Sequence, residues 1–109
     1  MRGLTYTREG GILKMILGFA DKETEKIFNY EFSKKLPIDI QRPALLKLIR
    51  LNNVSSIKDL VEPPSNHPEP LSGQRSGQWS IRINRQWRIT FTPIDGGANY
   101  INVKIEDYH

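Results

Sequence analysis

The chain has 109 residues and no cysteine, and its sixteen lysines and arginines against twelve aspartates and glutamates give a formal net charge of +4. This length suits one domain with a single core. The absence of cysteine excludes disulfides and thiolate metal sites and favours the reducing cytoplasm. The longest apolar run, near residues 16–20, is too short to span a bilayer, and residues 1–14 lack the apolar segment of a signal peptide. We therefore expect a soluble, cytoplasmic protein without a membrane partner.

Residues 1–14 are predicted to be an N-terminal extension. They contain a break at Gly10 and Gly11 and precede a second methionine, Met15. We expect this extension to be poorly ordered and the folded domain to span residues 15–109.

Two helices are predicted after a short opening strand at residues 15–19. The first helix should begin after the capping residue Asp21 and end near Lys34. The side chains expected on its inner face are Thr24, Ile27, Phe28 and Phe32. The second helix should hold Pro43 in its first turn, where proline costs least, and end at Asn52. Its expected apolar face comprises Leu45, Leu46, Leu48, Ile49 and Leu51.

A loop rich in proline follows the helices. One further short turn is expected first, capped by Ser55 or Ser56. Four prolines within residues 62–70 then indicate a rigid loop that has no helical structure.

Residues 77–91 predict a β-hairpin, because apolar and polar side chains alternate on both sides of a short turn. A three-residue turn keeps the apolar faces of the two strands together and pairs Trp79 with Phe91. The same register places Arg82 directly opposite Arg88. Two like charges in this position repel each other unless water or an anion separates them.

A second hairpin, closed at Gly96 and Gly97, is expected to lead into the last strand. The residues predicted to point into the core are Ile101, Val103 and Ile105, and those predicted to point away are Tyr100, Asn102 and Lys104. The helices are apolar on one side only, so they should cover the face opposite the arginines. The expected fold class is a two-layer α+β domain with helices on one face of a small, mainly antiparallel sheet, whose other face is bare and positively charged.

The positive charge on this sheet indicates a polyanionic partner. The stretch between Glu69 and Asp95 contains no acidic residue, and its four arginines are Arg75, Arg82, Arg85 and Arg88. Nucleic acid is the first candidate partner. We expect RNA contacts from Arg75, Arg82, Arg85 and Lys104. An acidic lipid, an acidic protein or a merely solvated surface stays open.

The chain ends in Asp107, Tyr108 and His109. If the pleat of the last strand continues, Tyr108 lies on the cationic face, whereas Asp107 and His109 need a local bend to reach it. RNA cleavage without a metal requires a base for the 2′-hydroxyl, an acid for the leaving 5′-oxygen and fixed positive charge at the phosphorane. These residues and the arginines meet those needs, although a terminal histidine is often frayed and exposed. No metal-ligand spacing, GxSxG motif or glycine-rich phosphate loop occurs, so we expect no metal and no cofactor.

Residues 15–109 also resemble HigB-type toxins of the RelE/ParE superfamily. The motifs that carry the resemblance include Lys35-Leu-Pro37, Pro63-Pro-Ser-Asn66, Leu71-Ser-Gly-Gln-Arg75, Gly77-Gln-Trp-Ser-Ile-Arg-Ile-Asn84, Gln86-Trp-Arg-Ile89 and Asp107-Tyr-His109. The resemblance implies a RelE-like domain that acts as the toxin of a type II toxin–antitoxin system. It further implies an enzyme that enters the A site of the 70S ribosome and cuts mRNA there without a metal. The implied partner is a HigA-type helix-turn-helix antitoxin. The toxin would associate with operator DNA only indirectly, through this antitoxin.

The resemblance also implies roles for individual residues. Arg88 would stabilise the phosphate, and Asp107, Tyr108 and His109 would form the acid–base group.

The chain departs from the family pattern at two positions. Ser72 stands where family members commonly carry a lysine, and Glu69 stands where some relatives carry a histidine. Loss of a cation beside the scissile phosphate removes charge-assisted hydrogen bonds worth roughly 1.5–3 kcal/mol each. Either Arg75 or His67 substitutes for that cation, or activity is reduced. Two other functions therefore stay open: a ParE-like toxin that binds a protein such as DNA gyrase, and a catalytically weak domain that only binds RNA or its antitoxin.

Overall fold

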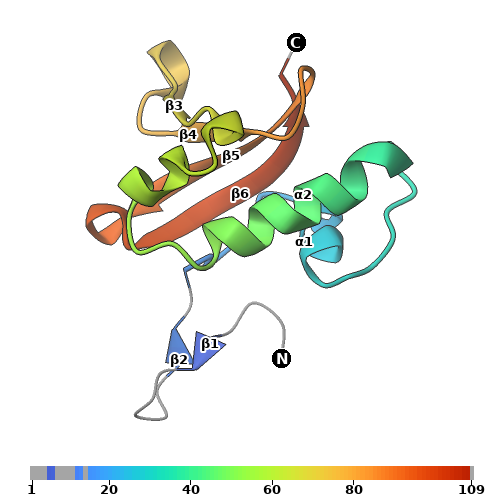
Figure 1. The fold of residues 1–109 in the computed structure, drawn as a ribbon, viewed down its shortest axis with the longest axis horizontal. Coiled ribbons are helices and arrows are strands. Elements are labelled where there is room, and N and C mark those ends of the chain that lie inside the picture. Colours follow the sequence, from blue (N-terminus) through green and yellow to red (C-terminus); the bar gives the residue numbers. More distant parts are fainter. Residues whose placement is uncertain (1–4, 7–11, 14, 109) are drawn as a thin grey trace.

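The structure is a computed structural model that describes residues 5–6, 12–13 and 15–108. Figure 1 shows two helices packed against one face of a curved sheet, with the C-terminal end of the chain at one edge of the domain. The sheet has four antiparallel strands in the order β3-β4-β5-β6. This arrangement confirms the predicted two-layer α+β fold. No helix in the described part of the chain has the length and apolar character needed to cross a membrane.

The predicted N-terminal extension falls largely on positions outside the described residues. Within it, β1 (Thr5–Tyr6) pairs with β2 (Ile12–Leu13) as a separate antiparallel ladder. The predicted poor order of residues 1–14 stays a prediction.

The predicted opening strand at residues 15–19 is an extended segment that runs parallel to the last strand. It forms two isolated bridges, Ile16 to Tyr100 and Phe19 to Val103, in place of a continuous ladder. The Leu17 amide donates a 2.8 Å hydrogen bond to the Tyr100 carbonyl. The segment therefore adds a parallel edge to an otherwise antiparallel sheet.

Helix α1 (Lys22–Phe28) begins where the sequence predicts and ends sooner. The Asp21 carboxylate accepts a 2.9 Å hydrogen bond from the Thr24 amide and so caps the helix. The prediction that the helix continues to Lys34 is wrong, because Tyr30 adopts a left-handed φ of 65° that cannot belong to an α-helix. The chain turns there, so Phe32 is 61% exposed and does not face the core as predicted.

Helix α2 (Ile38–Leu51) ends before Asn52, as predicted, and starts earlier than expected. Pro37 occupies the N-cap position, so Pro43 lies inside the helix, beyond its first turn. Its missing N–H leaves one helical carbonyl without its usual donor. The buried face is carried by Ala44, Leu48 and Leu51, while Leu46, predicted to be apolar core, is 54% exposed.

The proline-rich region has more structure than the sequence predicts. A 3₁₀ turn, η1 (Ile57–Val61), follows Ser56, and a second, η2 (Pro64–Asn66), lies inside the loop expected to have no helical structure. The loop ends in β3 (Glu69–Pro70), an edge strand that pairs with β4. Proline is tolerated there because an edge strand uses only one side of its backbone.

The central hairpin confirms the predicted register. Strand β4 (Trp79–Arg82) pairs with β5 (Trp87–Ile94) so that Trp79 faces Phe91 and Arg82 faces Arg88. A 3₁₀ turn, η3 (Gly73–Arg75), precedes this hairpin.

Strand β6 (Asn99–Asp107) follows the turn η4 (Asp95–Gly97) and contains a β-bulge that the sequence did not predict. Asn102 has a left-handed φ of 55° at the point where the register shifts. A bulge adds one residue to one strand and reverses the alternation beyond it. Tyr100, predicted to point away, is therefore fully buried, whereas Ile101, predicted to be core, is partly exposed.

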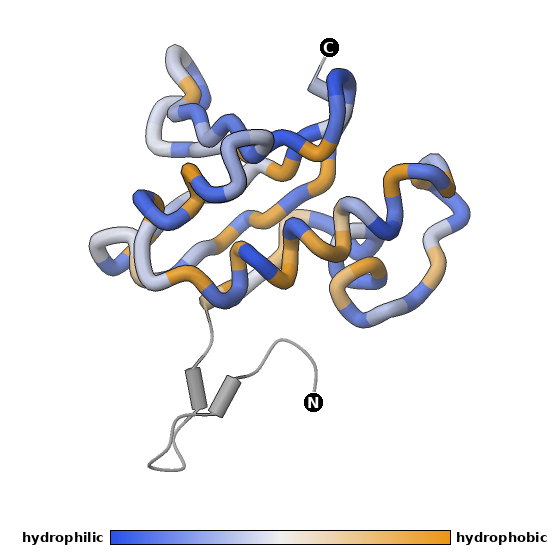
Figure 2. Tube along the Cα trace, in the orientation of Figure 1, coloured by the Kyte–Doolittle hydropathy of each residue, from blue (hydrophilic) through white to orange (hydrophobic). Residues whose placement is uncertain are grey.

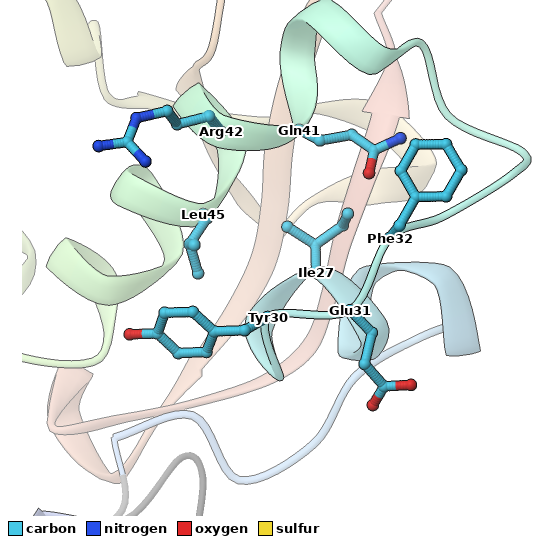
Figure 3. Close-up of a pocket in the computed structure, with 7 residues that line it drawn as sticks. All are labelled: Ile27, Tyr30, Glu31, Phe32, Gln41, Arg42 and Leu45. Atoms are coloured by element: carbon cyan, nitrogen blue, oxygen red, sulfur yellow. The ribbon is translucent and has the colours of Figure 1, made fainter.

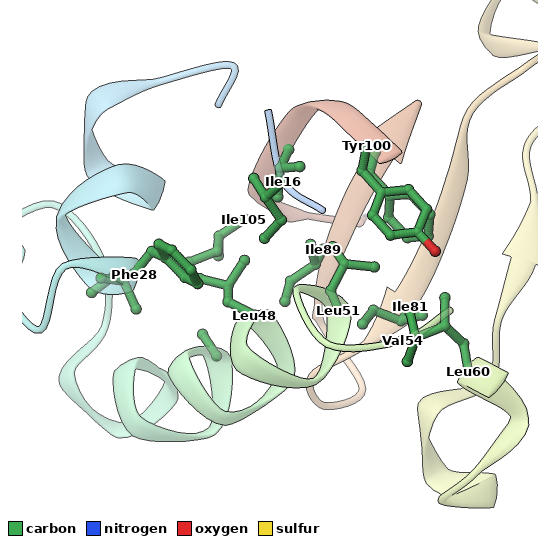
Figure 4. Packing of buried hydrophobic residues seen from close by; sticks show 14 of the residues in the cluster. Ile16, Phe28, Leu48, Leu51, Val54, Leu60, Ile81, Ile89, Tyr100 and Ile105 are labelled. Atoms are coloured by element: carbon green, nitrogen blue, oxygen red, sulfur yellow. The ribbon is translucent and has the colours of Figure 1, made fainter. Parts of the chain in front are cut away.

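The core lies between the helices and the sheet, with apolar positions recurring along α2 and the strands (Figures 2 and 4). Phe91 and Tyr100 pack edge to face, with ring centroids 5.0 Å apart. The Tyr100 hydroxyl is buried without a hydrogen-bond partner in the described part of the chain, and burial raises its pKa. The helices thus cover one face of the sheet and leave the other to polar side chains.

Candidate active site

The face of the sheet turned away from the helices carries alternate side chains of β4, β5 and β6. Their registers place on it Ser80, Arg82, Arg88, Thr90, Lys104 and Glu106. The prediction that Arg82, Arg88 and Lys104 share one face is confirmed. The face also carries carboxylates, because Glu106 lies opposite Arg88 in the register and Glu69 of β3 lies opposite Ser80.

Arg88 is the centre of this face and is only 6% exposed. Its Nε atom donates a 2.7 Å hydrogen bond to the Ser80 hydroxyl, and its Nη2 atom donates to the His67 carbonyl. The Glu69 carboxylate lies 3.9 Å from Nη2. A buried guanidinium needs such acceptors because it cannot lose its charge. The bonds from Nε and Nη2 fix the orientation of the guanidinium. Nη1 makes no hydrogen bond to any described residue and can therefore still donate one.

Tyr108 lies beside the Arg88 guanidinium, on the face predicted from the pleat. Its ring centroid is 5.0 Å from Cζ of Arg88, within the range of a cation–π contact. The Tyr108 amide donates a 2.8 Å hydrogen bond to the Gln86 carbonyl, which ties the end of the chain to the hairpin turn. The side chain stays 41% exposed and can therefore meet a ligand.

Asp107 and His109 are placed differently. Asp107 pairs with Trp87 in the register, and its carboxylate accepts a 2.8 Å hydrogen bond from Nε2 of Gln86. By the alternation of the strand it lies on the side opposite Arg88. His109 lies outside the described residues.

Glu106 and Arg75 form the shortest ion pair that the described residues make at this face, with 2.8 Å between nitrogen and oxygen. Two parallel hydrogen bonds join Nη1 and Nη2 of Arg75 to the Glu106 carboxylate at 2.9 and 2.8 Å. The Thr90 hydroxyl donates a further bond to Glu106. Arg75 holds the pKa of Glu106 below its usual value, helped by Thr90 and opposed by burial. The Nε atom of Arg75 donates to Gln78, so all three of its nitrogens already have partners within the protein.

The sequence model of the HigB-like toxins, described as RelE-like toxins of the type II toxin–antitoxin system HigB, matches residues 17–109. The chain belongs to this family. It is 36% identical over 85 residues to Toxin HigB-1 of Vibrio cholerae, a match that covers 77% of this chain and 90% of the relative. Family membership confirms the resemblance drawn from the sequence motifs.

A second relative and one solved structure are similar over less of the chain or at lower identity. Endoribonuclease HigB of Proteus vulgaris is 52% identical over 40 residues, which cover 37% of this chain and 41% of the relative. The solved structure of the YoeB/ParE toxin from Agrobacterium tumefaciens superposes with a TM-score of 0.50 at 18% identity, over 86% of this chain and 98% of the other. This likeness supports the RelE-like fold.

The remaining predicted RNA-binding residues of this HigB-like toxin lie on the central hairpin and on β6. Arg82 faces Arg88 across the hairpin, Arg85 is exposed in the hairpin turn, and Lys104 is exposed on β6 opposite Thr90. Their predicted contacts with RNA stay predictions.

The two auxiliary residues are also exposed. His67 has a left-handed φ of 41°, and it contacts Arg88 through its backbone carbonyl. Ser72 precedes η3 and makes no side-chain hydrogen bond as its cap. Among the described contacts, neither the His67 side chain nor the Ser72 side chain places a positive charge beside Arg88.

Sequence reasoning missed two residues of this site, Ser80 and Glu106. Both follow from the register: Ser80 stands beside Arg88 on the neighbouring strand, and Glu106 lies directly opposite it. The alternation that places Lys104 and Tyr108 on this face places Glu106 there too, because Glu106 lies two residues from each. The bulge in β6 changes the alternation only for the residues before it, such as Tyr100 and Ile101.

Proposed function

We propose that this HigB-like toxin is an endoribonuclease that cuts mRNA in the A site of the 70S ribosome without a metal and so inhibits translation. The observation that carries the proposal is the Arg88 guanidinium, buried on an open sheet face and fixed by Ser80 and His67 with Nη1 left to donate. Rigid donors of this kind stabilise negative charge that develops in a transition state. The name of the Proteus vulgaris relative, Endoribonuclease HigB, supports the same activity.

The chemistry is an attack of the RNA 2′-hydroxyl on the adjacent phosphorus. A bond forms between the 2′-oxygen and phosphorus, and the bond from phosphorus to the 5′-oxygen breaks. A base accepts the 2′-hydroxyl proton, and an acid donates a proton to the leaving 5′-oxygen. The products carry a 2′,3′-cyclic phosphate and a 5′-hydroxyl. In the described part of the chain, no three His, Asp or Glu side chains gather where they could share a metal ion.

We assign the charge stabilisation to Arg88 and the proton transfers to the terminal group. The 5.0 Å contact between the Tyr108 ring and the Arg88 guanidinium supports the assignment of both side chains to one site. His109 follows directly and supplies the second proton-transfer group in this proposal. Asp107, which contacts Gln86, orients the terminus.

RNA phosphates would be held by cations that solvent reaches. This role is assigned to Arg85 and Lys104, which are exposed, and to Arg82, which is half-buried. Arg75 contributes less, because Glu106 already neutralises much of its charge. Ser72 in place of a lysine then leaves Arg88 as the principal cation at the scissile phosphate.

A type II toxin acts together with an antitoxin. We propose that the partner is a HigA-type helix-turn-helix protein and that this toxin reaches operator DNA only through it. The site of action is the cytoplasm, where ribosomes and mRNA are found.

The test is to map new 5′ ends in a translated message with purified toxin, in the presence and absence of ribosomes. We expect cuts only with ribosomes, with 5′-hydroxyl and 2′,3′-cyclic phosphate ends. Cuts that carry 5′-phosphates would contradict the metal-free mechanism. DNA damage in expressing cells without new mRNA ends would instead indicate a ParE-like inhibitor of gyrase.

A further inference from the structure

The Arg88 guanidinium has two hydrogen-bond acceptors among the described residues, and only one of them lies on the neighbouring strand. Ser80 is on β4, where the pairing with β5 fixes its position. The other acceptor is the carbonyl of His67, in the loop between η2 and β3. His67 belongs to no strand ladder of the described chain. The orientation of Nη2, and with it that of Nη1, therefore depends on the contacts that hold this loop.

His67 has a backbone conformation that its own side chain does not explain. Its φ of 41° and ψ of 61° are left-handed, which costs a residue other than glycine free energy. The side chain is exposed, so packing of the imidazole does not offset this cost. Strained residues of this kind persist where neighbouring contacts determine the conformation, and they cluster at functional sites. The residues before His67 must therefore supply contacts that hold it.

Asn66, directly before His67, is fully buried and makes such contacts. Its Nδ2 atom donates hydrogen bonds of 3.0 and 3.1 Å to the carbonyls of Leu60 and Glu62. Its Oδ1 atom accepts a hydrogen bond from Nζ of Lys47 on α2. The donors and the acceptor of this amide are thus used inside the protein, and a buried polar group with all its partners rigidifies its surroundings. One side chain joins α2, η1 and η2 immediately before the carbonyl that holds Arg88.

Lys47 supports Asn66 from the helical layer. Figure 3 shows Arg42 and Leu45 of α2 at a hollow beside the end of α1. Residues two positions apart do not share a side of a helix, so Lys47 reaches the proline-rich loop instead. Partial burial lowers the pKa of Lys47, and none of the described residues forms an ion pair with it. Within the described part of the chain, its ammonium group therefore serves Asn66 and no carboxylate.

We propose that Asn66 is a positioning residue for the cleavage reaction. It holds the loop so that the His67 carbonyl fixes Nη2 of Arg88 and leaves Nη1 to donate to the scissile phosphate, and Lys47 supports it from α2. The inference rests on the proposed role of Arg88 and adds a residue that touches neither RNA nor a reacting atom. A misplaced guanidinium stabilises the transition state less, while other cations still hold the RNA. Loss of Asn66 should therefore lower the maximal cleavage rate and leave RNA affinity nearly unchanged.

The first experiment is single-turnover cleavage of mRNA on translating 70S ribosomes, measured with full-length toxin at a series of concentrations. Asn66→Asp keeps an acceptor for Lys47 and removes the two donated hydrogen bonds. Its maximal rate should fall about 10- to 100-fold, with the half-saturating toxin concentration within about twofold of wild type. Asn53→Asp, at an exposed asparagine outside this network, is the matched control and should keep the wild-type rate.

Lys47→Met is a second variant, which leaves the hydrogen bonds from Nδ2 of Asn66 in place. Its maximal rate should fall about threefold or more, and Lys47→Arg, which can still donate, should recover most of the loss. Lys34→Met, at an exposed lysine, is the control. A wild-type maximal rate in folded Asn66→Asp, or in Lys47→Met if Asn66→Asp does not fold, would overturn the proposal. A raised half-saturating concentration at an unchanged maximal rate would also overturn it, because it would indicate an RNA contact.

The second experiment observes the Arg88 guanidinium by nitrogen NMR spectroscopy and needs no RNA. A guanidinium held at both Nε and Nη2 rotates slowly and shows separate Nη signals, which are assigned by their absence from Arg88→Lys. The Arg88 signals should merge in Asn66→Asp, whereas those of Arg75, which Glu106 holds, should stay separate.

Separate Arg88 signals in Asn66→Asp would contradict the positioning role. Merging of the Arg75 signals as well would contradict it too, because it would show a general loosening of the fold. If the wild-type toxin cuts no mRNA, the proposed function fails, and these signals still decide whether Asn66 positions Arg88.

Discussion

Ser80 and Arg88 form a buried pair on neighbouring strands, in which Nε of Arg88 donates a 2.7 Å hydrogen bond to the Ser80 hydroxyl. This contact relieves the repulsion that the hairpin register would otherwise impose. Arg82 and Arg88 are paired directly, but the Arg88 side chain is drawn toward Ser80, His67 and the edge strand. A small polar residue on β4 thereby gives the arginine a single orientation.

Replacing Ser80 with alanine should destabilise the fold. The variant leaves Nε of Arg88 buried without its acceptor, so the free energy of unfolding should fall by about 1–3 kcal/mol. Urea denaturation measures this difference. The control is Ser76→Ala at an exposed position, which should change stability by no more than about 0.5 kcal/mol. Equal stability of the two variants would show that the Ser80 bond contributes nothing.

Replacing Glu106 with glutamine should remove a stabilising effect that depends on pH. The pKa of Glu106 is lower in the folded protein, because Arg75 favours the ionised carboxylate. Its contribution is therefore present above the ordinary pKa near 4.5 and is lost as the pH falls through the folded value. At pH 7 the variant should lose about 1–2 kcal/mol of unfolding free energy, since the ion pair is partly exposed.

In acid the difference between wild type and Glu106→Gln should shrink. Urea unfolding at a series of pH values tests this. Glu62→Gln, at an exposed glutamate without a side-chain ion pair among the described residues, is the control and should follow the wild-type curve. A Glu106→Gln difference that stays constant across the acid range would contradict the assignment.

Asn102 should be replaceable by glycine and not by valine. Its φ of 55° is tolerated by asparagine and glycine, whereas a β-branched residue is strained there. Asn102→Val should cost about 1–3 kcal/mol of unfolding free energy, while Asn102→Gly should stay close to wild type. Thermal unfolding of both variants checks this, and a stable valine variant would mean that the bulge does not require this conformation.

The central hairpin could be predicted because its alternation leaves one possible register. Apolar side chains recur at every second position on both strands, so the pairing of Trp79 with Phe91 follows from parity alone. The second hairpin could not be treated in this way. The bulge at Asn102 reverses the alternation, and a single asparagine, a residue common in turns, does not by itself indicate a bulge.

The helix boundaries were missed for a related reason. Helix α1 ends early because Tyr30 takes a left-handed conformation that no propensity predicts for tyrosine. Helix α2 accommodates Pro43 in its interior because the packing of its buried face outweighs one lost hydrogen bond. That face comprises Ala44, Leu48 and Leu51.

At the site, the shared face of the arginines followed from the sheet pattern. Their partners did not, because the ion pair of Arg75 with Glu106 joins positions far apart in the chain. Such long-range pairs depend on the final packing of η3 against β6. The placement of Tyr108 was predictable, since it needs only that the pleat of β6 continues by one residue.

The Tyr108→Phe variant should show whether the Tyr108 hydroxyl transfers a proton or the ring only packs against Arg88. The phenylalanine ring keeps its contact with Arg88, so the free energy of unfolding should be unchanged. If the hydroxyl transfers a proton, the single-turnover cleavage rate should fall by about a hundredfold or more. An unchanged rate in Tyr108→Phe would restrict Tyr108 to holding the guanidinium in place.

The most direct test of the central claim is the single-turnover rate of mRNA cleavage on translating ribosomes by Arg88→Ala. Circular dichroism and antitoxin binding would establish that this variant is folded, and Lys34→Ala, at an exposed lysine before α2, serves as the control. Loss of a preorganised charge at the scissile phosphate predicts a rate lower by about 10²–10³-fold, with the control at the wild-type rate. A folded Arg88→Ala toxin that cuts at the wild-type rate would contradict the account.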